Sequence, residues 1–309
     1  MIPKGSALIT ALLITAIVAT VATAIAVHLR ITIRETQLAH QFEQTYLDLQ
    51  GVQYWGMNQV IQNAKLSQQN HSTELYPQTM PATIFQQTQL SGEIADAQAL
   101  FNINALTNPT AQAQFTRLLK AIDNHISETQ ANQIAQAITR WLTPSNADSL
   151  YLQKNPPYRV SHQLMVSVSE LRLVNGISAT VYLALLPYIT ALPSSANEIN
   201  IFTAPLPILQ SLGINMSSAQ ANSLAACRQR FANTTGLSDI KQTCLLKAGL
   251  QIDPNINLIL RSNYFLIKGM AELGGQNLIL YTLIKRATLQ KATTTVFTAK
   301  LISQSLNTL

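Results

Sequence analysis

The sequence has little charge, few aromatic residues and only two cysteines. Charged side chains make up 11% of its 309 residues and aromatic ones 6%. Its polar character comes mainly from neutral Gln, Asn, Ser and Thr, which suits an extracytoplasmic protein that makes uncharged contacts. The net charge of +6 is scattered, without a run of basic residues. A solvated surface explains this pattern better than a nucleic-acid-binding surface, which concentrates Lys and Arg.

The sequence also lacks a recognisable catalytic or metal-binding constellation. The five histidines are far apart and do not have the spacing of metal ligands. The 14 acidic residues are dispersed, and no serine lies in a nucleophile-elbow pattern. We therefore expect a protein that is not an enzyme.

What the sequence does contain is a long apolar run near its N-terminus. Residues 6–27 carry no charge, no Pro and no Gly, and Lys4 is the charged residue that precedes them. About 20 apolar residues suffice to cross the hydrocarbon core of a membrane as a helix. A cleavable secretory signal has a shorter apolar region, followed by a small-residue cleavage site. We therefore expect a retained membrane anchor, with the rest of the chain on one side of the membrane.

This arrangement resembles the prepilin-type signal of type IV pilins and type II secretion pseudopilins. In that family a basic leader ending in Gly is removed by prepilin peptidase, and the apolar helix stays on the mature protein. The resemblance implies cleavage between Gly5 and Ser6. The chain departs from the family at the fifth mature position, where most pilins have Glu and this chain has Thr10. A Glu in the bilayer is costly unless it meets a positive charge, in pilins the N-terminal amine of the subunit above, so Thr10 suits a subunit at a filament tip.

The sequence of this segment leaves open whether it is a pilin-type helix and on which side of the membrane its N-terminus lies. An ordinary anchor helix would have the same composition. Arg30 and Arg34 flank its far end, so the positive-inside rule does not by itself favour a cytoplasmic N-terminus. The pilin resemblance implies that orientation, with a single pass through the inner membrane and the head in the periplasm.

Apolar residues after the anchor recur with helical spacing. Leu38, Phe42 and Tyr46 lie four positions apart, which predicts that the helix continues to about residue 67. Residues 68–89 are polar and contain two prolines, which predicts a loop. Beyond residue 263, two apolar runs joined by Gly274 and Gly275 predict paired strands.

Two segments in the middle of the chain resemble each other. Each holds an Asn-Ile pair and later a Gln-Ala-Asn sequence, which begins at Gln130 in one and at Gln220 in the other. Ser127 and Ser217 stand where N-caps would begin the two helices. We predict a duplicated helical module, and chance similarity is the alternative because there are only two copies.

The two cysteines, Cys227 and Cys244, allow either a disulfide or two buried thiols. An even number of cysteines beyond an anchor fits an oxidising compartment. A bridge would contribute roughly 3 kcal/mol of stability in the chain-entropy description.

Five motifs follow one another in order along the chain. They are Phe-Asn-Ile-Asn at 101–104, the Trp141 segment, Pro-Pro-Tyr-Arg at 156–159, Ser-Glu-Leu-Arg-Leu-Val at 169–174 and Asn-Ile-Phe-Thr-Ala at 200–204. Together they resemble the protein K family of type II secretion, which are large minor pseudopilins. The resemblance implies an α+β protein with a pilin-like fold, composed of a long N-terminal helix, a small antiparallel sheet and a large inserted helical domain. It divides the chain into a leader at 1–5, a stem at 6–67, a pilin-like head at 68–100 and 255–309, and the inserted domain at 101–254.

The resemblance also implies a role and partners. These proteins act in assembly of the pseudopilus tip and in secretion across the outer membrane, with minor pseudopilins I and J, the major pseudopilin, the prepilin peptidase and the inner membrane as partners. A minor type IV pilin-like protein that binds DNA or a surface ligand is the alternative.

Two features of related proteins are weak in this sequence. Members of the family can carry an acid-rich calcium loop after the Trp, but residues 143–148 contain a single carboxylate, that of Asp148, which suits a turn residue better than a calcium ligand. The second module also resembles a helix-hairpin-helix, whose Gly-rich hairpin lets backbone amides approach DNA phosphates. Here the hairpin has Gly213 alone and no nearby basic cluster. We therefore expect a structural or protein-binding use and no nucleic-acid partner.

Overall fold

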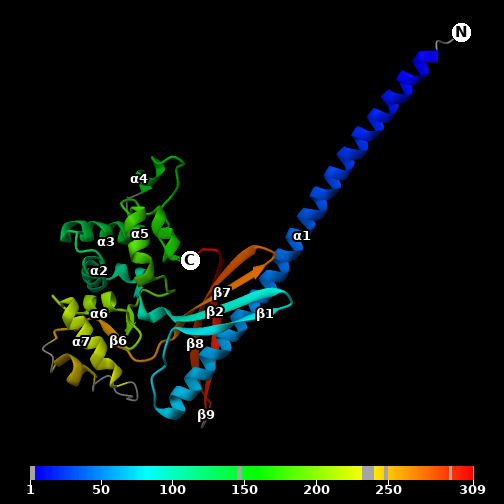
Figure 1. Cartoon of the computed structure of the whole chain (residues 1–309). Helices are drawn as coiled ribbons and strands as arrows, with labels where there is room; N and C mark the ends of the chain where they lie inside the picture. Colours follow the sequence, from blue (N-terminus) through cyan, green and yellow to red (C-terminus); the bar gives the residue numbers. More distant parts are fainter. Residues whose placement is uncertain (1–3, 145–147, 232–239, 247–249, 292–293, 309) are drawn as a thin grey trace.

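The computed structural model joins a long helix, a sheet and a helical domain (Figure 1). It describes residues 4–144, 148–231, 240–246, 250–291 and 294–308. Helix α1 spans Lys4–Asn70 without interruption. Its N-terminal part stands clear of the rest of the protein, and its C-terminal part lies against the sheet. The predicted α+β, pilin-like arrangement with an inserted helical domain is confirmed.

The sheet has five antiparallel strands in the order β1-β2-β7-β8-β9. Their bounds are β1 Gln78–Phe85, β2 Thr88–Asp96, β7 Tyr264–Leu273, β8 Gln276–Lys291 and β9 Thr294–Leu306. The predicted turn between β7 and β8 is confirmed, since Gly274 and Gly275 adopt φ values of +59° and +81° that favour glycine. The predicted loop at 68–89 is wrong at its two ends, where α1 continues to Asn70 and β2 begins at Thr88, and where it covers β1. Because β1 is an edge strand, Pro81 can occupy it without interrupting a ladder on both sides.

Facing glycines bring α1 close to the sheet. Gly92 of β2 pairs with Gly269 of β7, and a Cβ atom on Gly92 would lie 2.7 Å from the Val52 Cγ1 atom of α1. Leu49, Val52 and Val60 are buried against the sheet. The C-terminal half of the stem therefore forms one wall of the head's core.

The chain leaves the sheet after Asp96 and returns to it at Tyr264, and the residues between them form the helical domain. Its α-helices are α2 Pro109–Ile122, α3 Glu128–Leu142, α4 Asp148–Leu152, α5 Ala179–Leu185, α6 Leu206–Leu212 and α7 Ser218–Gln229. The 3-10 turns are η1 Ala97–Ala99, η2 Ile103–Thr107, η3 Val168–Leu173 and η4 Leu186–Tyr188, and η5 Lys241–Leu246 is a short π-helix. Short strands are β3 Phe101–Asn102, β4 Ile189–Thr190, β5 Glu198–Asn200 and β6 Asn257–Ile259. The proposed domain limits of 101–254 fall inside this interval.

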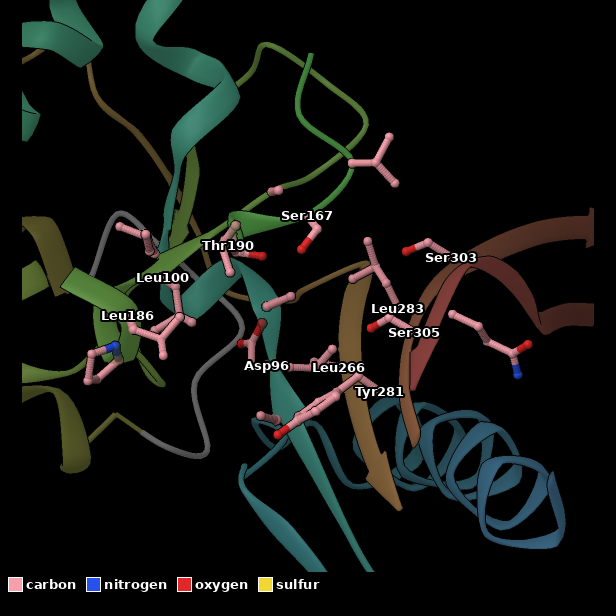
Figure 2. Close-up of a pocket in the computed structure, with 18 residues that line it drawn as sticks. Asp96, Leu100, Ser167, Leu186, Thr190, Leu266, Tyr281, Leu283, Ser303 and Ser305 are labelled. Atoms are coloured by element: carbon pink, nitrogen blue, oxygen red, sulfur yellow. The ribbon is translucent and has the colours of Figure 1, made fainter. Parts of the chain in front are cut away.

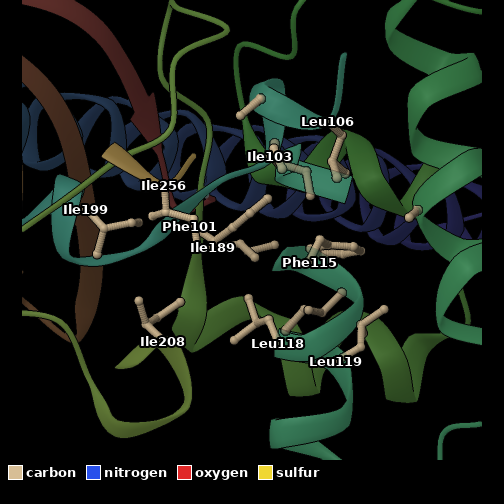
Figure 3. Packing of buried hydrophobic residues seen from close by; sticks show 14 of the residues in the cluster. Phe101, Ile103, Leu106, Phe115, Leu118, Leu119, Ile189, Ile199, Ile208 and Ile256 are labelled. Atoms are coloured by element: carbon tan, nitrogen blue, oxygen red, sulfur yellow. The ribbon is translucent and has the colours of Figure 1, made fainter. Parts of the chain in front are cut away.

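Both predicted modules have the same order of elements. β3 precedes α2 and α3 and pairs in parallel with β4, while β5 precedes α6 and α7 and pairs in parallel with β6. Ser127 and Ser217 are confirmed as N-caps, and each forms a capping box with Gln130 or Gln220. The helices of the two modules share one apolar core, in which Phe101, Phe115, Ile189 and Ile208 are packed (Figure 3). The side chains labelled there are Phe101, Ile103, Leu106, Phe115, Leu118, Leu119, Ile189, Ile199, Ile208 and Ile256.

Candidate functional site

The N-terminal part of α1 presents apolar side chains on all sides. Leu8, Ile17 and Val21 are each more than half exposed. Among the described residues, α1 is the one helix long and apolar enough to cross a membrane. The Thr10 hydroxyl donates to the Ala7 carbonyl at 3.0 Å, so this polar group is satisfied within the helix, as a membrane interior requires.

The predicted cleavage site lies at the beginning of α1. Gly5 and Ser6 are both in its first helical turns. Residues 1–3 of the predicted leader lie outside the described residues. Cleavage between Gly5 and Ser6 therefore stays a prediction.

One face of the stem stays uncovered where its other face packs on the sheet. Leu47 is 63% exposed and Tyr54 67% exposed, and between them Gly51 has no atom within 4 Å of the position of a Cβ. We call this surface the stem face, formed by Leu47, Gly51, Tyr54, Asn58, Gln62 and Lys65. These residues recur three or four positions apart and therefore lie on one side of the helix. The missing side chain at Gly51 leaves room for another backbone to approach.

A buried ion pair fastens the end of the stem to the sheet. Glu74, between α1 and β1, has its Oε2 atom 2.6 Å from Nη1 of Arg286 on β8, and the two side chains are 6% and 4% exposed. Arg286 Nη2 also donates to the Ser262 carbonyl at 2.5 Å, and its guanidinium lies 5.0 Å from the centre of the Phe265 ring. The Tyr76 hydroxyl donates to Glu74 Oε2 at 3.2 Å, and burial, followed by the charge of Glu74, raises the pKa of Tyr76. Tyr76 therefore stays a neutral donor.

Asp96 extends these contacts into the helical domain. Its Oδ2 atom accepts hydrogen bonds from the hydroxyls of Thr203 at 2.5 Å and Ser262 at 2.7 Å and from the Asn200 amide at 2.9 Å, and its Oδ1 accepts from the Gln98 N–H at 2.8 Å. Burial raises the pKa of the Asp96 carboxyl, and these hydrogen bonds oppose the rise.

Ser262 belongs to both sets of contacts, because its carbonyl binds Arg286 and its hydroxyl binds Asp96. We call the combined set the junction network, formed by Glu74, Tyr76, Asp96, Gln98, Asn200, Thr203, Ser262 and Arg286. It connects the end of the stem, the middle of the sheet and the second helical module. Such buried polar groups fix a unique arrangement only when they are satisfied, and the buried described side-chain atoms without a hydrogen-bond partner all lie outside this network.

The two cysteines lie at the end of the second module. Their Sγ atoms are joined in a disulfide 1.99 Å long, which connects α7 to η5. The neighbouring Arg228 donates from Nη1 to the carbonyls of Ile201 at 2.5 Å and Ala204 at 2.8 Å, and burial lowers its pKa to about 10. The disulfide and the Arg228 hydrogen bonds therefore both fix the position of the last turn of α7. The segment 232–239 between the cysteines lies outside the described residues.

The loop that corresponds to a calcium loop and the hairpin that resembles a DNA-binding one both lie in the helical domain. Within the described ranges, no group of three or more His, Cys, Asp and Glu side chains comes together. The carbonyl of Thr143, in the loop that corresponds to the calcium loop of related proteins, is 2.9 Å from His162 Nδ1, and the side chain of Asp148 is not described. Thr143 and Pro144, the residues of this loop whose side chains are described, carry no carboxylate. Gly213 in the hairpin between α6 and α7 faces Met216, which lies 2.7 Å from the position of a Cβ, so the glycine there serves packing.

The junction network was not predicted from the sequence. The acids were too dispersed to nominate any pair, and the network joins residues up to 212 positions apart. One local signal was present, since Arg286 continues the alternation of Leu280, Thr282 and Ile284, which face α1. An inward-facing Arg at the end of an apolar strand predicts a buried partner.

Comparisons with known proteins agree with the resemblance predicted from the motifs. Residues 99–194 match the family model described as type II secretion system protein K. Type II secretion system protein K of Pectobacterium carotovorum subsp. carotovorum is 29% identical over 206 residues, which make up 60% of this chain and 62% of that protein. The protein of the same name from Aeromonas hydrophila is 31% identical over 145 residues, 41% of this chain and 39% of that protein. The matches thus span less than two thirds of the length of these relatives.

A solved structure shares the fold. A chain in the crystal structure of the GspK-GspI-GspJ complex from the type 2 secretion system of enterotoxigenic Escherichia coli superposes with a TM-score of 0.62. The match covers 87% of this chain and 99% of that chain at 22% sequence identity.

Proposed function

We propose, from the type II secretion system protein K domain that this chain carries at residues 99–194, that the protein is a non-enzymatic minor pseudopilin at the tip of the type II secretion pseudopilus. It acts there in pseudopilus assembly and in protein secretion across the outer membrane. The observation that carries the proposal is the combination of this domain with a pilin-like sheet and a continuous stem helix. The domain distinguishes the chain from a pilin that has a stem and sheet alone.

The membrane placement follows from the stem. An apolar helix in which the hydroxyls of Thr10, Thr15, Thr20 and Thr23 each donate to a carbonyl of the same helix suits a single-pass anchor in the inner membrane, with the head in the periplasm. The disulfide between Cys227 and Cys244 supports an oxidising compartment for the helical domain. Thr10, which needs no charged partner from a subunit above, supports the tip position.

The partners proposed are minor pseudopilins I and J and the major pseudopilin. The complex with the similar fold contains proteins named GspI and GspJ, which supports the first two. The stem face is the surface proposed to meet them, since it is exposed, carries the apolar side chains of Leu47 and Tyr54, and lies on the same helix as the anchor. The helical domain lies beyond the end of the sheet, apart from the N-terminal part of α1 (Figure 1).

Co-purification tests this assignment. The full chain is expressed with minor pseudopilins I and J, extracted in detergent and captured by a C-terminal tag. We expect both partners to be recovered, and we expect Tyr54→Glu to lower their recovery severalfold because it places a charge on the stem face. Gln290→Glu, at an exposed position on β8, is the matched control and should have no effect. Retention of DNA without either partner would favour the alternative, a DNA-binding minor pilin.

Leader removal has its own measurement. Prepilin peptidase requires a small residue before the cleaved bond, so Gly5→Leu should leave residues 1–5 attached. Intact-mass analysis of the purified protein distinguishes the two products. A mature N-terminus downstream of Val27 would instead show removal of an ordinary signal peptide.

A further inference from the structure

Strand β9 forms an open edge of the five-stranded sheet. It pairs with β8 on one side, and no described strand pairs with its other side. The Asn307 N–H donates to the Ile279 carbonyl at 2.8 Å, so these two residues form a hydrogen-bonded pair. Hydrogen-bonded and non-hydrogen-bonded pairs alternate along an antiparallel ladder. Ser305 therefore turns its backbone groups toward β8, whereas Gln304 and Leu306 present their N–H and C=O groups to the free side.

The opposite edge of the sheet is protected against pairing, whereas residues 303–306 of β9 are not. β1 contains Pro81 and a register shift between Met80 and Thr83, two devices that natural edge strands use to prevent further pairing. Residues 301–306 of β9 contain neither Pro nor a charged side chain. The register shift of β9 precedes Ser303, so the strand beyond it runs regularly along β8.

A hollow flanks this end of β9 on the face of the sheet away from α1. It has a volume of about 240 Å³ and lies between the sheet and the helical domain. Figure 2 shows the side chains of Leu266, Tyr281, Leu283, Ser303 and Ser305 on its sheet side. Asp96 also borders it, but its carboxylate is hydrogen-bonded within the junction network.

A second hollow lies on the other face, between α1 and β9. Its volume is about 340 Å³, and it is lined by Phe42, Tyr46, Leu280, Gln304, Ser305 and Leu306. Gln304 and Ser305 border both hollows. The end of β9 is thus the wall between two hollows on opposite faces of the sheet.

We propose that the β9 edge at residues 303–306 binds an extended, uncharged strand of a partner protein. The backbone of that strand pairs with the outward N–H and C=O groups of Gln304 and Leu306. Successive side chains of a strand point to opposite faces, so one apolar side chain enters the hollow toward the helical domain and the next enters the hollow toward α1. Backbone pairing provides the affinity, and the two hollows select apolar side chains at alternate positions.

A second copy of this chain does not fit the same edge. Antiparallel pairing of β9 with β9 of another copy requires a twofold axis perpendicular to the sheet. Because α1 lies along a face of the sheet, that axis would direct the two stems in opposite directions (Figure 1). Two copies anchored in one membrane cannot pair in this way. This exclusion rests on the proposed membrane anchor, whereas strand binding itself does not.

The direct test uses the full chain in detergent micelles and a fluorescein-labelled peptide. The probe is a blocked, uncharged peptide of sequence Ser-Thr-Leu-Val-Leu-Thr-Ser, and binding is followed by fluorescence anisotropy. Two control peptides carry N-methyl groups on alternate amides, one on the odd and one on the even positions. Only one set of amides can face β9, so we expect one methylated peptide to bind at least tenfold more weakly and the other to bind like the parent. No binding of the parent, or equal effects of the two methylations, would overturn the proposal.

A matched pair of variants locates the site on the protein. Gln304→Pro removes the outward N–H, whereas Gln304→Val keeps it, and both lose the hydrogen bond from the Gln304 side chain to Gln53. We expect at least tenfold weaker binding with Pro and near-normal binding with Val. Equal binding by both variants would contradict pairing at this edge. If Gln304→Pro does not fold, the methylated peptides still test the proposal on the unaltered chain. A dimer of this chain that forms through β9 and excludes the peptide would overturn the choice of a partner protein's strand.

Discussion

Removing one partner of the buried pair formed by Glu74 and Arg286 should destabilise the head more than removing both. The two side chains are almost fully buried and 2.6 Å apart. Glu74→Leu leaves the guanidinium buried without its carboxylate, and Arg286→Met leaves the carboxylate buried with Tyr76 as its remaining donor. Breaking a buried pair in this way costs about 3–5 kcal/mol, because an uncompensated charge stays in a poorly solvated site.

The double variant should recover much of this loss. Replacing both charges with apolar side chains of similar size is often neutral or stabilising. Arg286 also serves the Ser262 carbonyl, and leaving that carbonyl unsatisfied costs about 1–3 kcal/mol. We therefore expect the double variant to lose about 1–3 kcal/mol, well below the sum of the single losses of about 6–10 kcal/mol.

Urea unfolding of the full chain in detergent gives the free energy of unfolding of the natural protein, the two single variants and the double variant, which together form a double-mutant cycle. Trp55 of α1 packs against the sheet, and Trp141 lies in the core of the helical domain. In a Trp141→Phe background the fluorescence of Trp55 therefore reports the head, and in a Trp55→Phe background the fluorescence of Trp141 reports the helical domain. The coupling should be largest for the Trp55 signal. A double variant as unstable as the sum of the two single variants would show that the charges do not act as a pair and would refute the reasoning.

Further predictions concern the disulfide, the stem and Asp96. Changing both Cys227 and Cys244 to Ser should lower the stability of the helical domain by about 2–5 kcal/mol without affecting the Trp55 signal; two thiols that label freely in the denatured, unreduced protein would contradict the bridge. Gly51→Ala should stabilise the stem by about 0.5–1 kcal/mol, because Ala favours a helix more than Gly does and its Cβ would meet no atom within 4 Å. Gly56→Ala should destabilise the stem because its Cβ would lie 2.7 Å from Ile267 Cδ1. The reverse order of urea midpoints would contradict this packing. Burial raises the folded-state pKa of Asp96, so its favourable contribution is complete below the unfolded pKa of about 3.9 and is lost as pH rises through the folded value. The stability of the natural chain relative to Asp96→Asn should therefore fall as pH rises above about 4, and parallel pH profiles of the two proteins would contradict the shift.

Features that depend on local spacing could be predicted from the sequence. The stem follows from apolar residues repeated every three or four positions, and the N-caps Ser127 and Ser217 follow from the Gln that stands three residues after each. The β7–β8 hairpin follows from two apolar runs around two glycines. In each case the determining residues lie within about one turn or one hairpin of each other.

Features that depend on distant residues could not be predicted. β1 was not predicted because Pro81, together with Pro77 just before the strand and the polar residues around them, is typical of a loop. This segment is a strand because β2 offers it a free edge. Asp96 reaches Thr203 and Ser262 across 107 and 166 positions of sequence. Nothing in the spacing of those residues indicates that they meet, and the two hollows beside β9 arise in the same way from packing between separate elements.

The position of the junction network explains how a large helical domain can be inserted without disturbing the sheet. Asp96 ends β2 opposite Phe265 near the start of β7, so the two points at which the chain leaves and rejoins the sheet are neighbours across one ladder. Asp96 and Ser262 bind each other there, and Asn200 and Thr203 bind the same carboxylate from inside the domain. Arg286 connects Ser262 to Glu74 at the end of the stem. A load applied to the helical domain therefore reaches the stem through central strands and a buried ion pair rather than through exposed loops.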